Sequence, residues 1–182
     1  MGPDLHSFYL KPGEMHFADE PTAVTTVLGS CLSITMFVSR IEVGAICHGL
    51  LPNCRGDRGC IGECEDGFKY VDCSIKRMLR IFDRLKVQKK EIEVKIFGGA
   101  DMFGVGNSRM TLTVGKQNIG IAKKLLSQNG LKVAASDTGG TNGRKIIFLT
   151  HTGEVFLKRI RKSEMPPVEK GRVIAHYKVK RT

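Results

Sequence analysis

Short apolar runs rich in β-branched residues dominate the N-terminal part of the chain, a pattern typical of β-strands. The run AVTTVLGSCLSITMFV spans residues 23–38 and is broken once by a Gly-Ser pair, which predicts two strands meeting at a bend. The run IEVGAICHGLL at 41–51 predicts the return strand of a hairpin whose loop lies near residues 39–40. Cys31 therefore follows the bend directly, and His48 lies on the return strand.

Two later segments have apolar residues at helical spacing. The first runs from Tyr70 to Leu85 behind a possible cap at Asp72, and the second runs from Asn118 to Gln128. Short strands are predicted around them, in a lead-in segment before residue 22 and at 93–97, 131–135, 145–149 and 154–157. Strands interspersed with two helices predict an α/β (α+β) domain, with a mixed sheet layered with helices.

The chain has the size of one domain. Its 182 residues, 41% of them hydrophobic, are enough for one buried core and too few for two full domains. We expect a single domain at residues 1–165 and a basic tail at residues 166–182. No stretch approaches the roughly 18 consecutive apolar residues that span a bilayer, and the N-terminus lacks the pattern of an export signal. We therefore expect a cytoplasmic protein that is not inserted in the membrane.

The formal net charge of +11 favours an acidic partner through long-range attraction. Nucleic acid, an anionic membrane surface and an acidic protein all fit that description. A basic nucleic-acid-binding module without enzymatic activity is therefore an alternative function. The chain has no Trp and three Tyr, so few aromatic side chains accompany the cations to stack on bases.

The cysteine content does not indicate a disulfide scaffold, because such scaffolds belong to short exported chains. Reduced thiols are expected at all six positions, which are Cys31, Cys47, Cys54, Cys60, Cys64 and Cys73. The last four could supply soft metal ligands, but their spacing does not reproduce the paired Cys-x2-Cys knuckles of structural zinc sites. We expect neither a metal nor another cofactor.

A thiol and an imidazole come together if the hairpin has a two-residue loop. Positions whose numbers add up to 79 then face each other, as Cys31 and His48 do, and opposed Cβ atoms lie about 4.5 to 5.5 Å apart. Cys47 would point to the opposite face. The imidazole could take the thiol proton and stabilise the thiolate, which lowers the pKa of Cys31. The residues alone equally allow a buried apolar cysteine and a satisfied core histidine.

Such a pair can attack an amide. Backbone N–H groups at the bend of Gly29, Ser30 and Cys31 could receive the oxyanion, while the imidazolium protonates the departing nitrogen. The product is a thioester that water then hydrolyses.

Several segments in order resemble the signature segments of the CheD family of chemoreceptor glutamine deamidases. They read VLGSC, AICHGLLP, IFGGADMF, VGKQNI and SDTGGTNGRK, and the match runs from about Thr22 to Ile160. The resemblance implies a catalytic triad of Cys31, His48 and Thr25, with Thr25 holding the imidazole in its productive orientation and tautomer.

The resemblance also implies a two-sheet sandwich similar to bacterial toxin deamidases, with no metal. The implied substrates are glutamine side chains in the cytoplasmic helical domain of chemoreceptors, and receptor glutamyl methyl esters could pass through the same thioester. The phosphatase CheC restrains some members of the family. The cysteine-rich loop after Pro52 departs from the family pattern.

Two glycine-rich motifs have competing interpretations. Asp137 opens a DTG triplet of the kind found in aspartic proteases, although a glycine-dense turn capped by an Asp is the simpler interpretation. The segment GGADMFGVG at 98–106 lacks the spacing of nucleotide-binding loops. A close backbone approach explains its glycines better.

Overall fold

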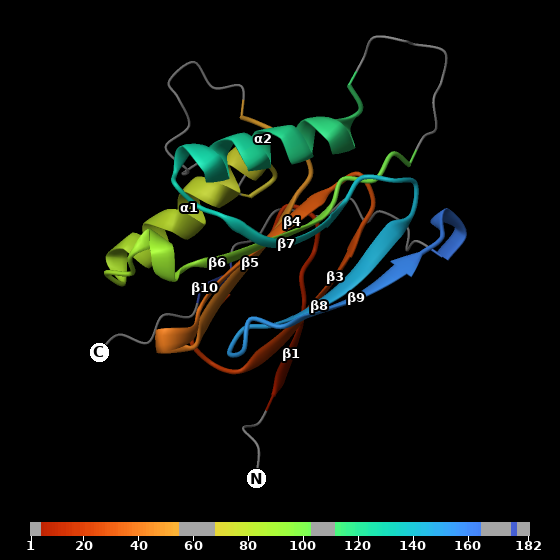
Figure 1. Ribbon diagram of the computed structural model, residues 1–182. Coiled ribbons are helices and arrows are strands. Elements are labelled where there is room, and N and C mark those ends of the chain that lie inside the picture. The colour runs from red at the N-terminus through yellow and green to blue at the C-terminus, as the bar shows by residue number, and fades with distance from the viewer. Residues whose placement is uncertain (1–4, 55–67, 103–111, 165–175, 178–182) are drawn as a thin grey trace.

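The computed structural model describes residues 5–54, 68–102, 112–164 and 176–177 (Figure 1). Two α-helices, ten strands and three short 3-10 helices are the regular elements of this part of the chain. The helices are α1 (Val71–Arg84) and α2 (Val114–Gln128). The strands are β1 (His6–Tyr9), β2 (Met15–Ala18), β3 (Thr22–Leu28), β4 (Leu32–Val38), β5 (Val43–Gly49), β6 (Glu93–Gly98), β7 (Val133–Thr138), β8 (Gly143–Leu149), β9 (Val155–Ile160) and β10 (His176–Tyr177).

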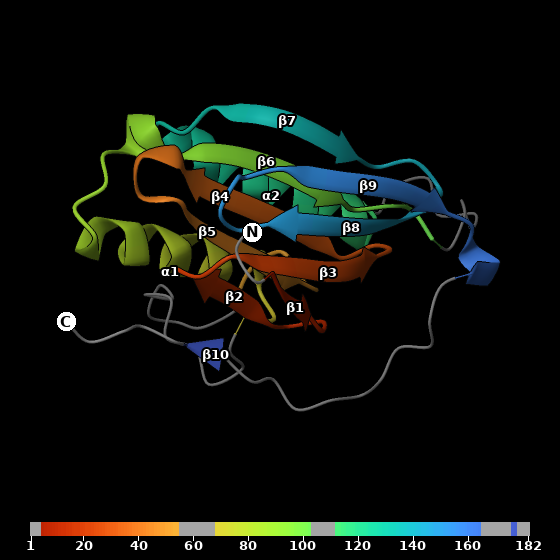
Figure 2. The same cartoon turned by 90° about the horizontal axis from the view of Figure 1, so that it is seen from below.

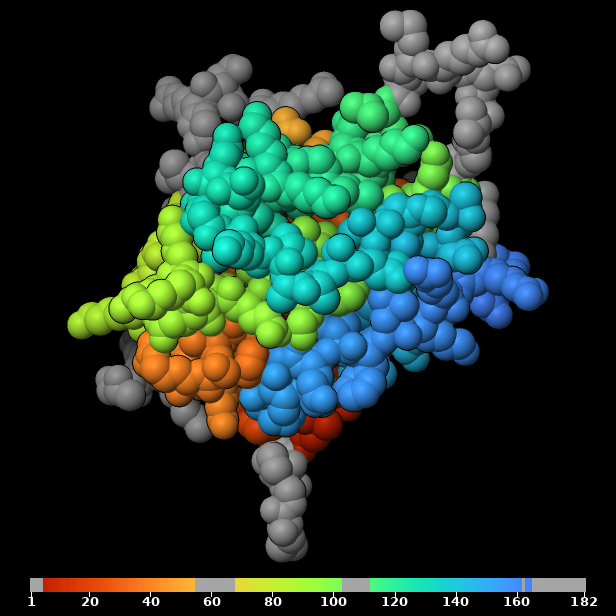
Figure 3. Space-filling model, viewed as in Figure 1, coloured from red at the N-terminus to blue at the C-terminus, as the bar shows by residue number. Residues whose placement is uncertain are grey.

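The strands form two sheets. The small sheet has the order β1-β3-β8-β9, and the large sheet has the order β10-β2-β5-β4-β6-β7. Both helices lie on one side of the large sheet, and the small sheet lies on its other side (Figures 1 and 2). The space-filling view shows the helices above and the strands β8 and β9 below, closed into one continuous surface (Figure 3). The fold is therefore an α+β sandwich with three layers.

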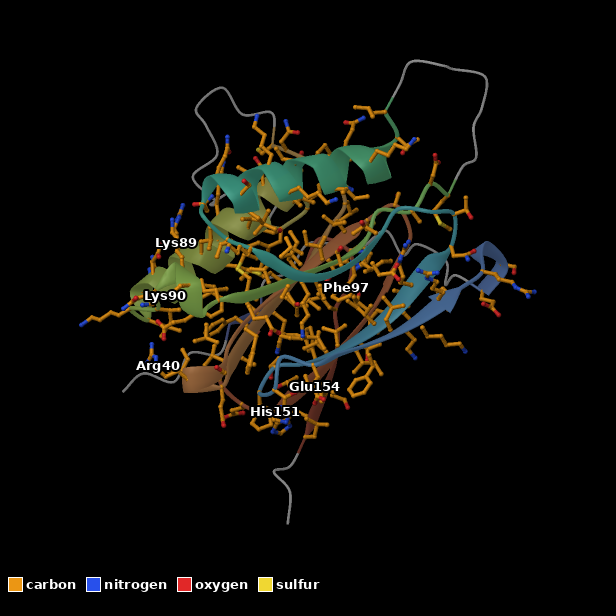
Figure 4. The ribbon with its side chains drawn as sticks, in the orientation of Figure 1. Arg40, Lys89, Lys90, Phe97, His151 and Glu154 are labelled. Carbon is orange, nitrogen blue, oxygen red and sulfur yellow. The ribbon has the colours of Figure 1, made fainter. Side chains whose placement is uncertain are left out.

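Burial on both faces explains the apolar composition of the central strand β4. Leu32, Ile34 and Met36 belong to the core between the large sheet and the helices. Phe37 belongs to the second core, between the two sheets. Phe97 of β6, labelled in Figure 4, belongs to the same intersheet core. A strand covered on both faces needs apolar side chains at nearly every position, unlike a half-exposed strand.

The predicted fold class is confirmed, with two sheets and two helices in the predicted places. The predicted Asp72 cap is wrong, because Tyr70 occupies the N-cap of α1 and Asp72 lies in its first turn. The helix α2 begins four residues earlier than predicted, at Val114, because the Thr113 side chain caps it by accepting from the N–H of Lys116.

The basic tail at 166–182 lies mostly outside the described residues. Its residues 176–177 form β10, which pairs in parallel with β2 at the edge of the large sheet. Sequence patterns did not predict this strand. Neither helix of the described residues is long and apolar enough to cross a membrane.

Candidate active site

Cys31 and His48 lie on the same side of the large sheet, although not in the predicted register. Ser33 is the residue directly opposite His48 across the β4–β5 ladder, so paired positions add up to 81 instead of 79. The two strands are joined by a 3-10 turn at Ser39–Ile41 and a left-handed Glu42, which makes the connection longer than a two-residue loop. Because side chains alternate with a period of two, a two-residue shift keeps the same face.

The shared face points into the space between the sheets. His48 is 1% exposed, and its ring contacts Thr26 on β3 of the small sheet. Cys31 is partly buried and packs against the intersheet core. Cys47 belongs to the other core, beneath the helices, as predicted from the alternation.

The hydrogen bonds of Thr26 fix the tautomer of His48. The Thr26 hydroxyl donates to the Leu10 carbonyl oxygen at 2.8 Å, and its oxygen lies 2.7 Å from Nδ1 of His48. A carbonyl oxygen only accepts, so the single hydroxyl proton is committed to Leu10 and the hydroxyl oxygen must accept from the imidazole. Nδ1 therefore carries the ring proton, which leaves Nε2 unprotonated. Nε2 is buried and has no hydrogen-bond partner within the described part of the chain.

In this structure Thr26 makes the contact with His48 that the family resemblance assigned to Thr25, and a catalytic role for Thr25 stays a prediction. Along β3 the side chains of Thr26 and Leu28 are buried, whereas Thr25 is only half-buried and points to the outer face of the small sheet. A neighbouring position on a strand cannot reach the same partner. Thr25 contributes through its backbone, because its carbonyl oxygen accepts from the N–H of Leu10 at 2.9 Å.

Burial keeps both members of the pair neutral. It raises the pKa of the Cys31 thiol to about 11, against a smaller lowering by the residue's own backbone. It lowers the pKa of His48 to about 4, against a smaller raising by the backbone of Leu10. Desolvation disfavours the charged form of each group, and Nε2 has no contact to an anionic sulfur. Burial therefore disfavours the predicted resting ion pair, and we expect removal of the thiol proton to accompany attack on a substrate.

Alkylation kinetics will report this neutral state. Because the pKa of Cys31 is raised, the thiolate forms only as the pH approaches the higher value, and the iodoacetamide rate at Cys31 should titrate above the ordinary thiol pKa of about 8.5. Peptide mapping of the labelled protein separates Cys31 from the other thiols. His48→Ala should leave this titration of the free enzyme nearly unchanged. A Cys31 pKa below the ordinary thiol value that rises in His48→Ala would instead support the predicted ion pair.

The bend that carries Cys31 is held by the end of β6. The N–H of Gly99 donates to the Cys31 carbonyl at 2.7 Å, and the N–H of Ala100 donates to the Gly29 carbonyl at 2.8 Å. Gly98 has a φ of 105°, and a Cβ there would collide with the Cys31 carbonyl oxygen. The glycines of this segment therefore permit a close backbone approach, as predicted; its residues 103–106 lie outside the described residues.

The same bend also carries backbone N–H groups that can act as hydrogen-bond donors to a substrate. The N–H groups of Ser30 and Cys31 donate to no backbone carbonyl of the described residues. Two adjacent unpaired amides beside a thiol are the kind of donor that can receive an oxyanion.

A side chain of α2 ties the bend to the strand of the histidine. The Nδ2 atom of Asn118 donates to the carbonyls of Ser30 and Leu50, each at 3.0 Å, and the residue is fully buried. Ser30 precedes Cys31, and Leu50 lies two positions after His48. Asn118 lies in the motif VGKQNI, but its role could not be predicted, because a bridge between two distant backbone segments leaves no local pattern.

Asp137 joins the two sheets at this end of the molecule. Its Oδ1 lies 2.8 Å from a guanidinium nitrogen of the buried Arg144, and its Oδ2 lies 2.7 Å from Arg159. Although burial acts to raise the pKa of Asp137, hydrogen bonds from Arg159 and Arg144 outweigh it and the pKa is lowered. An aspartic protease needs two carboxylates that share a proton, and this carboxylate is instead held ionised by two cations. The N–H of Gly139 also donates to the carbonyl of Gly98, next to the Cys31 bend.

The cysteine-rich loop is only partly described. Cys60 and Cys64 lie outside the described residues. Cys54 and Cys73 both direct a backbone N–H to Oδ1 of Asp72, at 3.2 and 2.7 Å. The absence of zinc therefore stays a prediction.

Comparison with known proteins assigns the family. The family model described as "CheD chemotactic sensory transduction" matches residues 50–159. A Geobacter sulfurreducens protein named "Probable chemoreceptor glutamine deamidase CheD 2" is 51% identical over 89% of this chain and 95% of its own length. A Maridesulfovibrio salexigens protein named "Probable chemoreceptor glutamine deamidase CheD" is 38% identical over 87% of this chain and 95% of its own length.

Likeness to solved structures is distant. The C-terminal domain of CNFy from Yersinia pseudotuberculosis aligns with a TM-score of 0.33 and 9% identity, covering 86% of this chain and 62% of that one. The curated relatives, in contrast, extend over nearly the whole sequence, including the bend, the return strand and the glycine-rich segments described above. The chain belongs to the CheD family.

Proposed function

We propose that this protein is a chemoreceptor glutamine deamidase in which Cys31 is the nucleophile and His48 the general base. The observation that carries the proposal is the tautomer of His48. Its proton is bound on Nδ1 by Thr26, so the lone pair of Nε2 is available in the space that Cys31 also faces. The curated names of the relatives supply the substrate class.

In the first half of the reaction, the Cys31 sulfur attacks the side-chain amide carbon of a glutamine while its proton passes to Nε2 of His48. The carbonyl oxygen becomes an oxyanion, which the free N–H groups of Ser30 and Cys31 receive. The imidazolium then gives its proton to the amide nitrogen, the carbon–nitrogen bond breaks and ammonia leaves. A glutamyl thioester remains on Cys31. A glutamyl methyl ester would give the same thioester, with methanol as the leaving group.

In the second half, water attacks the thioester carbon and gives a proton to Nε2. The carbon–sulfur bond breaks, and the imidazolium returns the proton to the sulfur. The net change is glutamine plus water to glutamate plus ammonia.

The partners follow from the same proposal. The substrate is the cytoplasmic helical domain of a chemoreceptor, which places the enzyme in the cytoplasm, and the net charge of +11 favours an acidic protein surface. CheC remains a proposed regulator, and nucleic acid is not expected to bind. No metal or other cofactor enters the steps above.

The direct test is incubation of the purified protein with cytoplasmic fragments of chemoreceptors from the same organism. We expect peptide mass mapping to find specific glutamines converted to glutamate, with release of an equal amount of ammonia. Chelator should leave the rate unchanged. Unmodified receptor fragments, together with salt-sensitive retention of bulk RNA or DNA, would favour the nucleic-acid-binding alternative.

A further inference from the structure

Two polar side chains lie opposite each other in the active site, and each carries a buried atom with no hydrogen-bond partner among the described residues. Oγ of Ser33 and Nε2 of His48 are both buried and make no hydrogen bond within the described part of the chain. Ser33 is the direct cross-strand partner of His48. A buried polar group left unsatisfied costs about 1 to 3 kcal/mol, so two such groups on one face call for an explanation.

The geometry limits what could satisfy them. Cβ atoms of directly opposed residues lie about 4.5 to 5.5 Å apart, so the side chains of Ser33 and His48 are neighbours on the same face of the sheet. Cys31 lies two positions before Ser33 and packs in the intersheet core that this face borders. Nε2 can only accept, because the proton is on Nδ1, whereas a hydroxyl both donates and accepts. A water molecule fits both requirements, since it can donate to Nε2 and exchange a second hydrogen bond with Ser33.

We propose that Ser33 and His48 together hold the water that hydrolyses the Cys31 thioester, with Ser33 as a positioning residue for this second half of the reaction. This inference rests on the proposed function. As the water oxygen bonds to the thioester carbon, one of its protons passes to Nε2 and the other O–H stays on the hydrogen bond to Ser33. The carbon–sulfur bond breaks, and the sulfur takes the proton from Nε2.

The first half of the reaction does not use this water. Ser33→Ala should therefore leave the release of ammonia in a single turnover nearly unchanged and slow the decay of the thioester, roughly ten-fold or more. A receptor cytoplasmic fragment serves as substrate. Acid quenching followed by intact-mass analysis measures the covalent adduct, which should accumulate on Ser33→Ala but not on the wild type. Hydroxylamine, an external nucleophile, should restore turnover of the variant, and Ser33→Thr should restore hydrolysis.

Thr35→Val is the matched control. Thr35 is also buried and lies on the same strand and the same face, but two positions further from Cys31 and opposite Ile46. Removing the Thr35 hydroxyl should change neither the release of ammonia nor the decay of the thioester. Equal slowing of ammonia release and thioester decay in Ser33→Ala, or no slowing of either, would overturn the role of Ser33. If the wild type itself gave neither adduct nor ammonia, the proposed function would fall first and this inference with it.

Discussion

Cys31→Ala will abolish glutamine deamidation, with a loss on the order of a thousand-fold or more, because no other atom of the site can form the thioester. Cys31→Ser should fail in the same way, since a hydroxyl beside a neutral imidazole is a weaker nucleophile than the thiol. Ammonia release from receptor fragments measures the loss. Circular dichroism and thermal unfolding should show both variants folded, because Cys31 is only partly buried.

Cys54→Ser provides the control for Cys31. Cys54 is also partly buried, but it lies beside Asp72 at the start of α1 and away from the intersheet space. We expect its replacement to leave most activity. Comparable turnover by Cys31→Ala would refute the proposed chemistry, and inactivity of Cys54→Ser would require a role for the cysteine-rich loop.

Local patterns predicted the elements of the fold because burial imposes a period on each one. The β-branched runs on either side of the bend became β3 and β4, and the helical spacing after Tyr70 became α1. What the patterns could not supply was pairing between distant strands. The parallel pair β1–β3 and the strand β10 depend on contacts that leave no local sequence signal.

In the candidate site, too, local patterns predicted which face a side chain occupies but not its contacts with distant strands. The side of the sheet shared by Cys31 and His48 was predicted correctly although the register was not, because an even shift preserves the face. The threonine that contacts His48 lies one position from the Thr25 that the resemblance implies, and along a strand an odd shift reverses the face. Sequence spacing also carries no information about how deeply the pair is buried, and burial shifts the pKa values of Cys31 and His48 against the expected ion pair.

Turnover rates of single variants test the role of His48 and of the threonine that contacts it. His48→Ala should lose activity on the order of a thousand-fold, since His48 is the base that takes the thiol proton in the proposed reaction.

Thr26→Val keeps the shape of the side chain and removes the oxygen that accepts from Nδ1–H. A hydrogen bond to a charged group contributes about 1.5 to 3 kcal/mol, so the imidazolium formed during catalysis should lose enough stabilisation to slow turnover about 10- to 100-fold. Thr25→Val removes a hydroxyl from the outer face of the same strand and should change the rate by about two-fold or less.

The pH dependence of kcat/KM separates a chemical role from a structural one. Its acidic limb reports protonation of His48, whose pKa is already depressed to about 4, and loss of the acceptor destabilises the protonated form further. The limb should therefore move to lower pH in Thr26→Val and stay in place in Thr25→Val. The opposite order, with Thr25→Val slow and Thr26→Val active, would show that the enzyme works with a register different from the one in which Thr26 contacts His48.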